Sequence, residues 1–113
     1  MFYRKDGTPY TGETRLSDFA KDFEDMAYRR IGFTSLANGI EISTVWLGID
    51  HGFGNKYRPL IFESMAFHNG RGGDLECWRY ATLEEATIGH KWMVKKYQVF
   101  KSIDQIVAKP EGD

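Results

Sequence analysis

The dipeptide Asn38-Gly39 lies between two apolar runs and constrains the fold more than any other feature of the sequence. Both residues tolerate the positive φ of a type I′ turn, so the runs 31–37 and 40–50 are expected to pair as an antiparallel hairpin. A two-residue turn also predicts the register. In that register Ala37 pairs with Ile40, Ser35 with Ile42, and Phe33 with Thr44.

Two further strands and two helices are predicted around this hairpin. Pro59 suits the start of a strand at 59–68, and a glycine-rich turn leads to another strand at 75–81. Apolar steps of three and four predict a helix from the N-cap Ser17 to about residue 30. A capping box at 82–85 starts a second helix that ends near residue 100. The expected fold is α+β: a four-stranded antiparallel meander sheet with an N-terminal and a C-terminal helix packed on it.

A chain of 113 residues is long enough for one domain. We expect an N-terminal arm over 1–16, a single α+β domain over 17–101 and a C-terminal tail over 102–113. The arm contains aromatic residues that are expected to pack against the domain or against a neighbouring subunit. Gly89 inside the second helix disfavours helix by roughly 1 kcal/mol relative to alanine, which predicts a close approach of helix and sheet there.

Alternation along the last two strands predicts two apolar faces. One face is expected to carry Phe62, Ser64, Ala66, Cys77 and Arg79, and the other Glu63, Met65, Phe67, Trp78 and Tyr80. A sheet with two apolar faces must be covered on both. Either the helices lie on opposite faces, or a second copy covers one of them. The aromatic face favours the second case, a homo-oligomer with Met65, Phe67, Trp78 and Tyr80 at its interface.

The loop at 50–58 is the candidate ligand site. Its glycines let backbone amides approach a ligand, its cations could bind phosphate, and its aromatic rings could stack on a base. The predicted contacts are Asp50, His51, Gly52, Phe53, Gly54, Lys56, Tyr57 and Arg58, with Arg79 beneath them. Two other interpretations remain open: an ordinary loop packed on the core, and a structural salt bridge for Arg79.

Several functional classes are disfavoured by the sequence. His51 and His90 lack metal-ligand spacing, and His90 lies on an apolar stripe, so no metal or cofactor is expected. Cys77 is predicted to be a buried, inert thiol, and no nucleophile is placed beside a base, so the protein is not expected to be an enzyme. The 15 basic and 16 acidic residues make duplex nucleic acid an unlikely partner. No apolar run approaches the ~20 residues of a membrane span, which predicts a soluble protein of a reducing compartment.

Three phrases of the sequence together resemble one family. They are Thr44-Val-Trp-Leu-Gly-Ile-Asp-His51, Pro59-Leu-Ile-Phe-Glu-Ser-Met-Ala-Phe67, and Arg79-Tyr-Ala-Thr82 followed by Glu84-Glu-Ala86 and Gly89-His90. The chain is similar here, over roughly residues 17–95, to small, mostly uncharacterised accessory proteins of tailed bacteriophages and prophages. Ser64 and Ala66 depart slightly from the typical Thr and Val of that pattern.

The resemblance implies a bacteriophage protein that acts in the cytoplasm of the bacterial host, and it brings no catalytic residues with it. By analogy with other accessory phage proteins, we expect a non-enzymatic binding protein that counteracts antiviral defence by sequestering a small anionic nucleotide signal. One alternative is a protein–protein inhibitor that blocks a host defence enzyme, such as a CRISPR-type enzyme, through the aromatic sheet face. A small accessory enzyme that acts through His51 is a further alternative.

Overall fold

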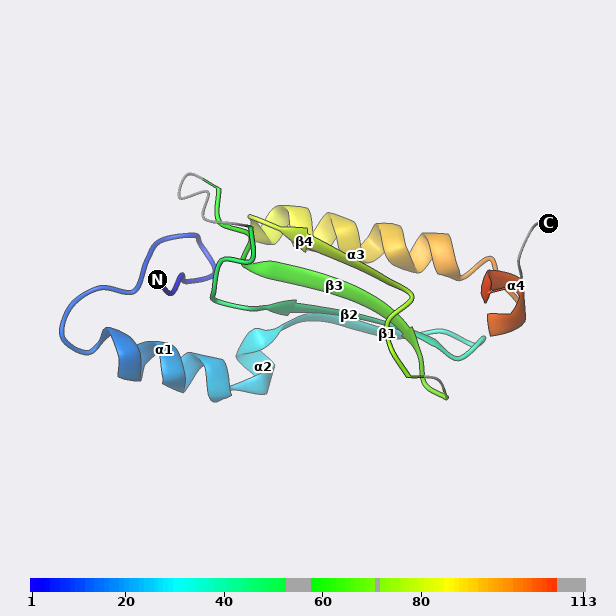
Figure 1. Ribbon diagram of the computed structural model, residues 1–113, viewed down its shortest axis with the longest axis horizontal. Coiled ribbons are helices and arrows are strands. Elements are labelled where there is room, and N and C mark those ends of the chain that lie inside the picture. Colours follow the sequence, from blue (N-terminus) through cyan, green and yellow to red (C-terminus); the bar gives the residue numbers. More distant parts are fainter. Residues whose placement is uncertain (53–57, 71, 108–113) are drawn as a thin grey trace.

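The computed structural model describes residues 1–52, 58–70 and 72–107. Its centre is an antiparallel sheet in which each strand pairs with its neighbour in sequence, in the order β1-β2-β3-β4. The strands are β1 (Arg30–Ser35), β2 (Ile40–Trp46), β3 (Phe62–His68) and β4 (Glu76–Tyr80). The helix α3 (Leu83–Tyr97) contacts all four strands, as Figure 1 shows. The predicted α+β meander is confirmed.

The predicted N-terminal helix is two helices, α1 (Arg15–Glu24) and α2 (Met26–Arg29). Asp25 separates them because its backbone is extended, with φ −83° and ψ 99°, while its side chain accepts a hydrogen bond from the Tyr28 amide and caps α2. The predicted N-cap is wrong. The helix begins after Thr14, and the Ser17 hydroxyl donates instead to the Thr14 carbonyl. A short helix, α4 (Ile103–Val107), follows α3.

The turn between β1 and β2 falls where it was predicted, but its register differs by one residue. Thr34 pairs with Ile42 and Ser35 with Glu41, so the turn contains three residues and ends at Gly39, whose φ is 88°. The slip places Gly32 opposite Thr44 and moves Phe33 to the other face. The packing of α3 explains this register, because a Cβ atom on Gly32 would lie 3.1 Å from the His90 ring.

Asn38 joins this turn to the end of α3. Its side-chain oxygen accepts a hydrogen bond from the Ile40 amide at 3.0 Å. Its side-chain nitrogen donates to the carbonyls of Tyr97 and Phe100 at 3.0 and 2.7 Å. These two carbonyls belong to the helix C-terminal region, where backbone acceptors lack partners within the helix. The turn residue therefore also closes α3.

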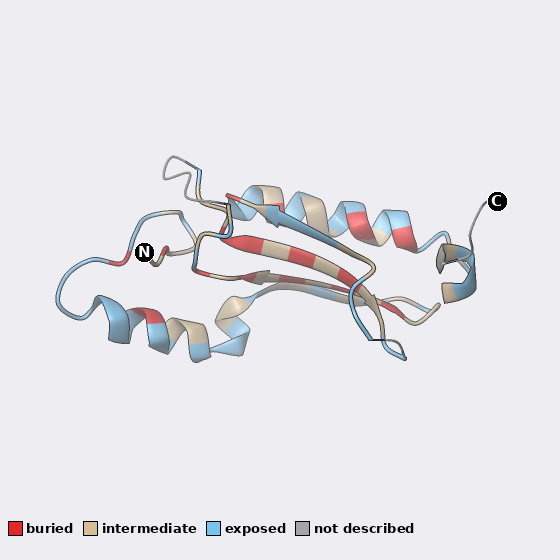
Figure 2. Cartoon of the chain, viewed as in Figure 1, coloured by how far each residue is buried: buried red, intermediate tan, exposed pale blue. Residues whose placement is uncertain are grey.

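Two buried clusters form the core. The first surrounds Trp46, and its other buried members are Tyr3, Tyr10, Phe19, Ile61, Phe62 and Ala86. The second surrounds Ile42, with Ile40, Ala66, Met93 and Tyr97. Figure 2 shows how buried and partly buried positions alternate along β3, as a sheet buried on one face requires. The arm at 1–16 thus contributes Tyr3 and Tyr10 to the core, and the Trp46 indole nitrogen donates to the Tyr3 carbonyl at 3.0 Å.

The predicted faces of the sheet are wrong for β4. Residues paired across an antiparallel sheet have side chains on the same face, and Ser64 pairs with Trp78 while Met65 pairs with Cys77. One face therefore carries Phe62, Ser64, Ala66, Glu76, Trp78 and Tyr80, and the other carries Glu63, Met65, Cys77 and Arg79. The length of the segment 69–75 determines this register. Its sequence is rich in glycine and has no apolar pattern that would predict which β4 side chains share a face with those of β3.

Candidate functional site

A chain of polar side chains lies beneath α3, on the covered face of the sheet. The His90 ring forms hydrogen bonds to the Thr34 hydroxyl at 2.9 Å through Nε2 and to the Thr44 hydroxyl at 2.7 Å through Nδ1. Thr44 also shares a hydrogen bond of 2.6 Å with Ser64, and both residues are fully buried. Burial lowers the pKa of His90. His90 is hydrogen-bonded, as the sequence predicted, but it is only partly buried and belongs to neither core cluster. The hydroxyl chain itself was not foreseen.

The opposite face of the sheet is not covered by the described helices. We call it the open face; its apolar members are Phe33, Val45, Met65 and Phe67. None of these four belongs to either buried cluster, and Phe33 is 43% exposed. Polar residues lie between them: Glu41, Ser43, Glu63, Cys77 and Arg79. A partly apolar face that is not covered within its own chain is suited to contact another molecule.

A hollow of about 600 Å³ lies at the β4 corner of the open face. His51, Gly52 and Arg79, three of the predicted ligand contacts, line it together with Met65 from the predicted interface. The other lining residues are Leu60, Glu63, Asp74, Cys77 and Trp78. The other predicted contacts, Phe53, Gly54, Lys56 and Tyr57, lie outside the described residues, and their role stays a prediction.

Among the described residues that line the hollow, two are acidic, Glu63 and Asp74, and one is a permanent cation, Arg79. Arg79 forms an ion pair with its cross-strand neighbour Glu63, with 3.1 Å between Nε and Oε2. The sequence left two roles open for Arg79, a contact with an anionic ligand and a structural salt bridge. The salt bridge is what the structure contains. Glu63 and Asp74 together carry more charge than Arg79 alone, and a phosphate group would be repelled by that excess.

Cys77 is exposed on the open face, so the prediction of a buried thiol is wrong. Its position follows from the register of β4, which turns it away from α3. Desolvation, together with a hydrogen bond that the thiol donates to Glu63 at 3.3 Å, raises the pKa of Cys77 to about 11. The side chain is therefore a thiol at neutral pH, and a thiol is a poor nucleophile.

Two of the predicted ligand residues, Asp50 and Arg58, form contacts within the chain. The Asp50 side chain accepts hydrogen bonds from the amides of Gly52 at 2.7 Å and Leu60 at 2.8 Å, which close the base of the loop. Arg58 forms an ion pair with Glu85 near the start of α3. Arg58 therefore lies away from the hollow on the open face, and it does not line that hollow with Arg79.

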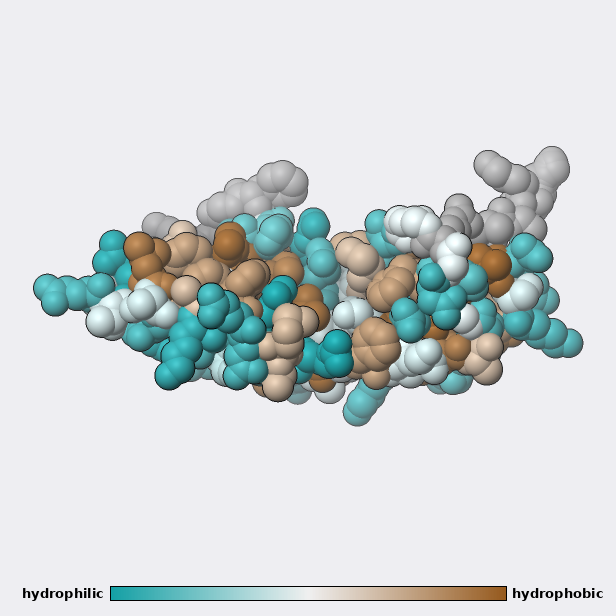
Figure 3. All heavy atoms as spheres, turned by 90° about the horizontal axis from the view of Figure 1, so that it is seen from below, coloured by the Kyte–Doolittle hydropathy of each residue, from teal (hydrophilic) through white to brown (hydrophobic). Residues whose placement is uncertain are grey.

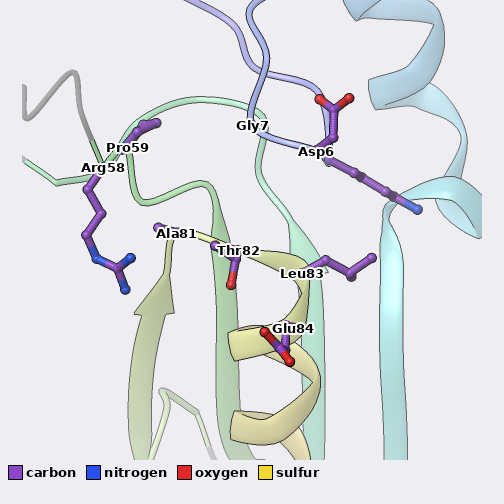
Figure 4. A pocket seen from close by; sticks show the side chains of 9 residues that line it. Asp6, Gly7, Arg58, Pro59, Ala81, Thr82, Leu83 and Glu84 are labelled. Carbon is purple, nitrogen blue, oxygen red and sulfur yellow. The ribbon is translucent and has the colours of Figure 1, made fainter.

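Arg58 lines a different hollow, of about 520 Å³, between the N-terminal arm and the start of α3. Figure 4 shows this space, with Asp6 and Gly7 on one side and Thr82, Leu83 and Glu84 on the other. Its two cations are already engaged, Arg58 with Glu85 and Lys5 with the Tyr28 ring, 3.9 Å from its centroid. Because Asp6 and Glu84 also line it, the described residues around this hollow carry no excess of positive charge.

The four predicted interface residues do not form one surface. Met65 and Phe67 lie on the open face, whereas Trp78 and Tyr80 lie on the face that α3 covers. The Tyr80 hydroxyl occupies the space beside Gly89, where a Cβ atom would lie 2.1 Å from it. The predicted close approach of α3 and sheet at Gly89 is thereby confirmed.

Apolar side chains are exposed elsewhere as well. Figure 3 shows one side of the molecule, on which groups of apolar side chains alternate with hydrophilic ones. Leu16 and Met26 are 59% and 56% exposed in that part of the chain. None of the described helices is both long enough and apolar enough to cross a bilayer.

The chain was compared with models of known protein families, with characterised proteins and with solved structures, and none of them matched.

Proposed function

We propose that this chain is a bacteriophage-encoded, non-enzymatic binding protein that counteracts host defence by binding a host protein through the open face of its sheet. One observation carries the proposal: α3 covers one face, while the opposite face leaves Phe33, Val45, Met65 and Phe67 partly or largely exposed. Apolar side chains rimmed by charged ones are the usual composition of a protein-binding surface. The bacteriophage setting and the host cytoplasm as its location rest on the sequence resemblance.

The charge of the hollow supports a particular partner chemistry. Glu63 and Asp74 line it, and only Arg79 opposes them among the described lining residues. A partner that inserts a lysine or arginine side chain would add the missing positive charge, and Met65 would contact the stem of that side chain. We infer a partner surface with one projecting basic residue surrounded by apolar ones.

Nucleotide sequestration has less support from the same geometry. A nucleotide needs cations that are free to neutralise phosphates, but Arg58 is paired with Glu85 and Arg79 with Glu63. Both arginines line a groove between β4 and α3, but each is held there by its carboxylate partner. The non-enzymatic part of the proposal is supported by Cys77, which is protonated at neutral pH, and by His90, which lies between two threonine hydroxyls.

The test uses the tagged full chain, produced in phage-infected bacteria, with mass spectrometry of the proteins and small molecules that it retains. The variant Met65→Glu places a charge at the centre of the open face and is expected to lose the retained host protein. Leu16→Glu is the matched control, because Leu16 is exposed on α1, away from the sheet. Circular dichroism verifies that both variants are folded, and phage plating on a defended host measures protection.

The outcomes separate the candidate functions. A host protein retained by the wild-type chain and Leu16→Glu, and lost with Met65→Glu together with phage protection, supports the proposal. An intact nucleotide released on denaturation would replace it with sequestration, and a chemically altered ligand would indicate an enzyme. If Met65→Glu retains the same host protein and protects phage normally, the open face is not the binding surface.

A further inference from the structure

A second surface lies along the outer edge of β4, between that strand and α3. We call it the β4 groove; it has a volume of about 490 Å³. Trp78 and Trp92 are 50% and 52% exposed there, and their rings meet edge to face with centroids 6.1 Å apart. Ile88 continues the apolar wall and is 61% exposed. Half-exposed tryptophans grouped in this way are typical of interface centres.

The floor of the β4 groove is an open strand edge. β4 pairs with β3 on one side, and no strand of the described chain lies on its other side. The outer edge of such a strand presents backbone N–H and C=O groups to which another strand can pair. An added strand would satisfy these backbone groups and cover the tryptophans in the same step.

We propose that a second copy of this chain occupies the β4 groove, with the two β4 strands paired antiparallel about Trp78. Only this register pairs all five residues from Glu76 to Tyr80 with the second strand. Trp78 then faces Trp78 of the second copy, and Cys77 faces Arg79. Aromatic residues placed opposite each other across paired strands stabilise a sheet.

The charges of α3 complement this two-fold arrangement. Glu85, Ile88, Trp92 and Lys96 are spaced by three and four residues and therefore share one side of the helix. Glu84 and Glu85 lie in the first turn of α3, and Lys95 and Lys96 lie in its last turn. A two-fold axis through Trp78 reverses one helix relative to the other, so the Glu85 end of one copy faces the Lys96 end of the second.

The existing ion pairs fit the same arrangement. Glu85 is paired with Arg58, and Lys96 with Glu76 at 2.7 Å. Bringing these two pairs together places charges of alternating sign beside one another, and no charge is left buried alone. A host protein in the groove would need to supply such a matched surface, whereas a second copy has it already.

The size of the groove predicts the strength of the dimer. An aromatic side chain buries about 150–250 Å², so the exposed halves of four tryptophans contribute roughly 300–500 Å². Ile88 and the strand backbones add to this area, but the total stays near the lower end of specific interfaces, at about 1,200 Å². The dimer should therefore depend on concentration. Trp78 and Arg79 line both the β4 groove and the hollow at the β4 corner of the open face. The dimer is argued from β4 and α3 alone, so it does not rest on the proposed function.

Disulfide trapping tests the register directly. The variant Arg79→Cys places a thiol opposite Cys77 of the second copy, and mild oxidation should convert the purified protein to a covalent dimer of twice 13.0 kDa. Ser35→Cys is the matched control, since Ser35 is exposed on β1, the other edge strand of the sheet. The trapped fraction of Arg79→Cys should exceed that of Ser35→Cys at least tenfold.

Light scattering of the wild-type chain provides the second measurement. We expect the mass to rise toward the dimer at high micromolar concentration, and Ile88→Lys to keep it at 13.0 kDa. Leu16→Lys, at an exposed apolar position on α1, should behave as the wild type. A wild-type chain that stays monomeric at high micromolar concentration overturns the proposal. So does an Arg79→Cys variant that is trapped no better than Ser35→Cys.

Discussion

A Cβ atom added to Gly89 would lie 2.1 Å from the Tyr80 hydroxyl oxygen, so the two residues fit together only because Gly89 has no side chain. This contact fixes the height of α3 above β4. It also explains why a residue that disfavours helix by roughly 1 kcal/mol relative to alanine stands in the middle of a helix of 15 residues.

We therefore predict that Gly89→Ala destabilises the protein. The gain in helix propensity is outweighed by the clash with Tyr80, and overpacking of this kind costs roughly 1–3 kcal/mol. Urea unfolding should report a lower free energy of unfolding. The matched control is Gly72→Ala, because a Cβ atom there would have no neighbour within 4 Å. Equal stabilities of the two variants would contradict the close approach.

The partly buried position of His90 predicts a pH dependence of stability. Burial lowers the pKa of His90 below its usual 6.5, so in mildly acidic solution the unfolded chain binds a proton that the folded chain does not. The contribution to stability is complete above pH 6.5 and is lost as the pH falls from there to the folded pKa. Thermal unfolding between pH 8 and 5 should show this fall, and His90→Gln should remove it.

His51→Gln is the control for that measurement, because the His51 side chain is exposed. It should retain the fall in stability seen for the wild-type chain. A wild-type melting temperature that stays constant through this range would show that His90 can take up a proton without leaving its site.

Asn38→Ala should loosen the end of α3. The substitution leaves the carbonyls of Tyr97 and Phe100 without this donor and also removes the bond to the Ile40 amide. Loss of such partly buried bonds costs roughly 1–3 kcal/mol in total. Hydrogen exchange should become faster in the last turn of α3. Asn69→Ala changes an exposed asparagine in the next turn and should leave exchange in α3 unaltered.

The capping box and the ion pair at the start of α3 should differ in their contributions. Thr82 accepts a hydrogen bond from the Glu85 amide at 3.1 Å, and loss of such a cap costs about 1 kcal/mol. The pair of Arg58 with Glu85 is exposed, and exposed pairs contribute roughly 0–1 kcal/mol. Thr82→Ala should therefore lower the denaturant midpoint more than Arg58→Ala. The reverse order would mean that the ion pair holds the loop before β3 in place.

The features that could be predicted from the sequence are those set by a few adjacent residues. The capping box formed with Thr82 as N-cap, although Glu85 reaches back to the Ala81 amide, one residue before the Thr82 amide. Gly89 indicated a close approach because glycine destabilises a helix and is therefore expected there only where a side chain would not fit. The turn at Asn38-Gly39 also formed where its residues indicated.

Features that depend on register could not be predicted in the same way. A shift of one residue exchanges the two faces of a strand, and turn sequences do not determine such a shift unambiguously. In the first hairpin the space required by His90 selects Gly32 over Phe33, and this contact spans more than fifty residues. At β4 the error moved Arg79 and Cys77 onto the wrong face. The predicted interface was therefore split, with Met65 and Phe67 on one face of the sheet and Trp78 and Tyr80 on the other.

The meander order of the strands implies a sequence of events in folding. Each strand pairs with a neighbour along the chain, so the sheet can assemble by closing short loops, which is fast. The bond from His90 to Thr34 instead joins residues 56 positions apart, and it requires α3 to be docked. Docking of α3 thus forms contacts of longer range than the pairing of adjacent strands does. Until it occurs, the hydroxyls of Thr44 and Ser64 remain open to water on one side of an unfinished sheet.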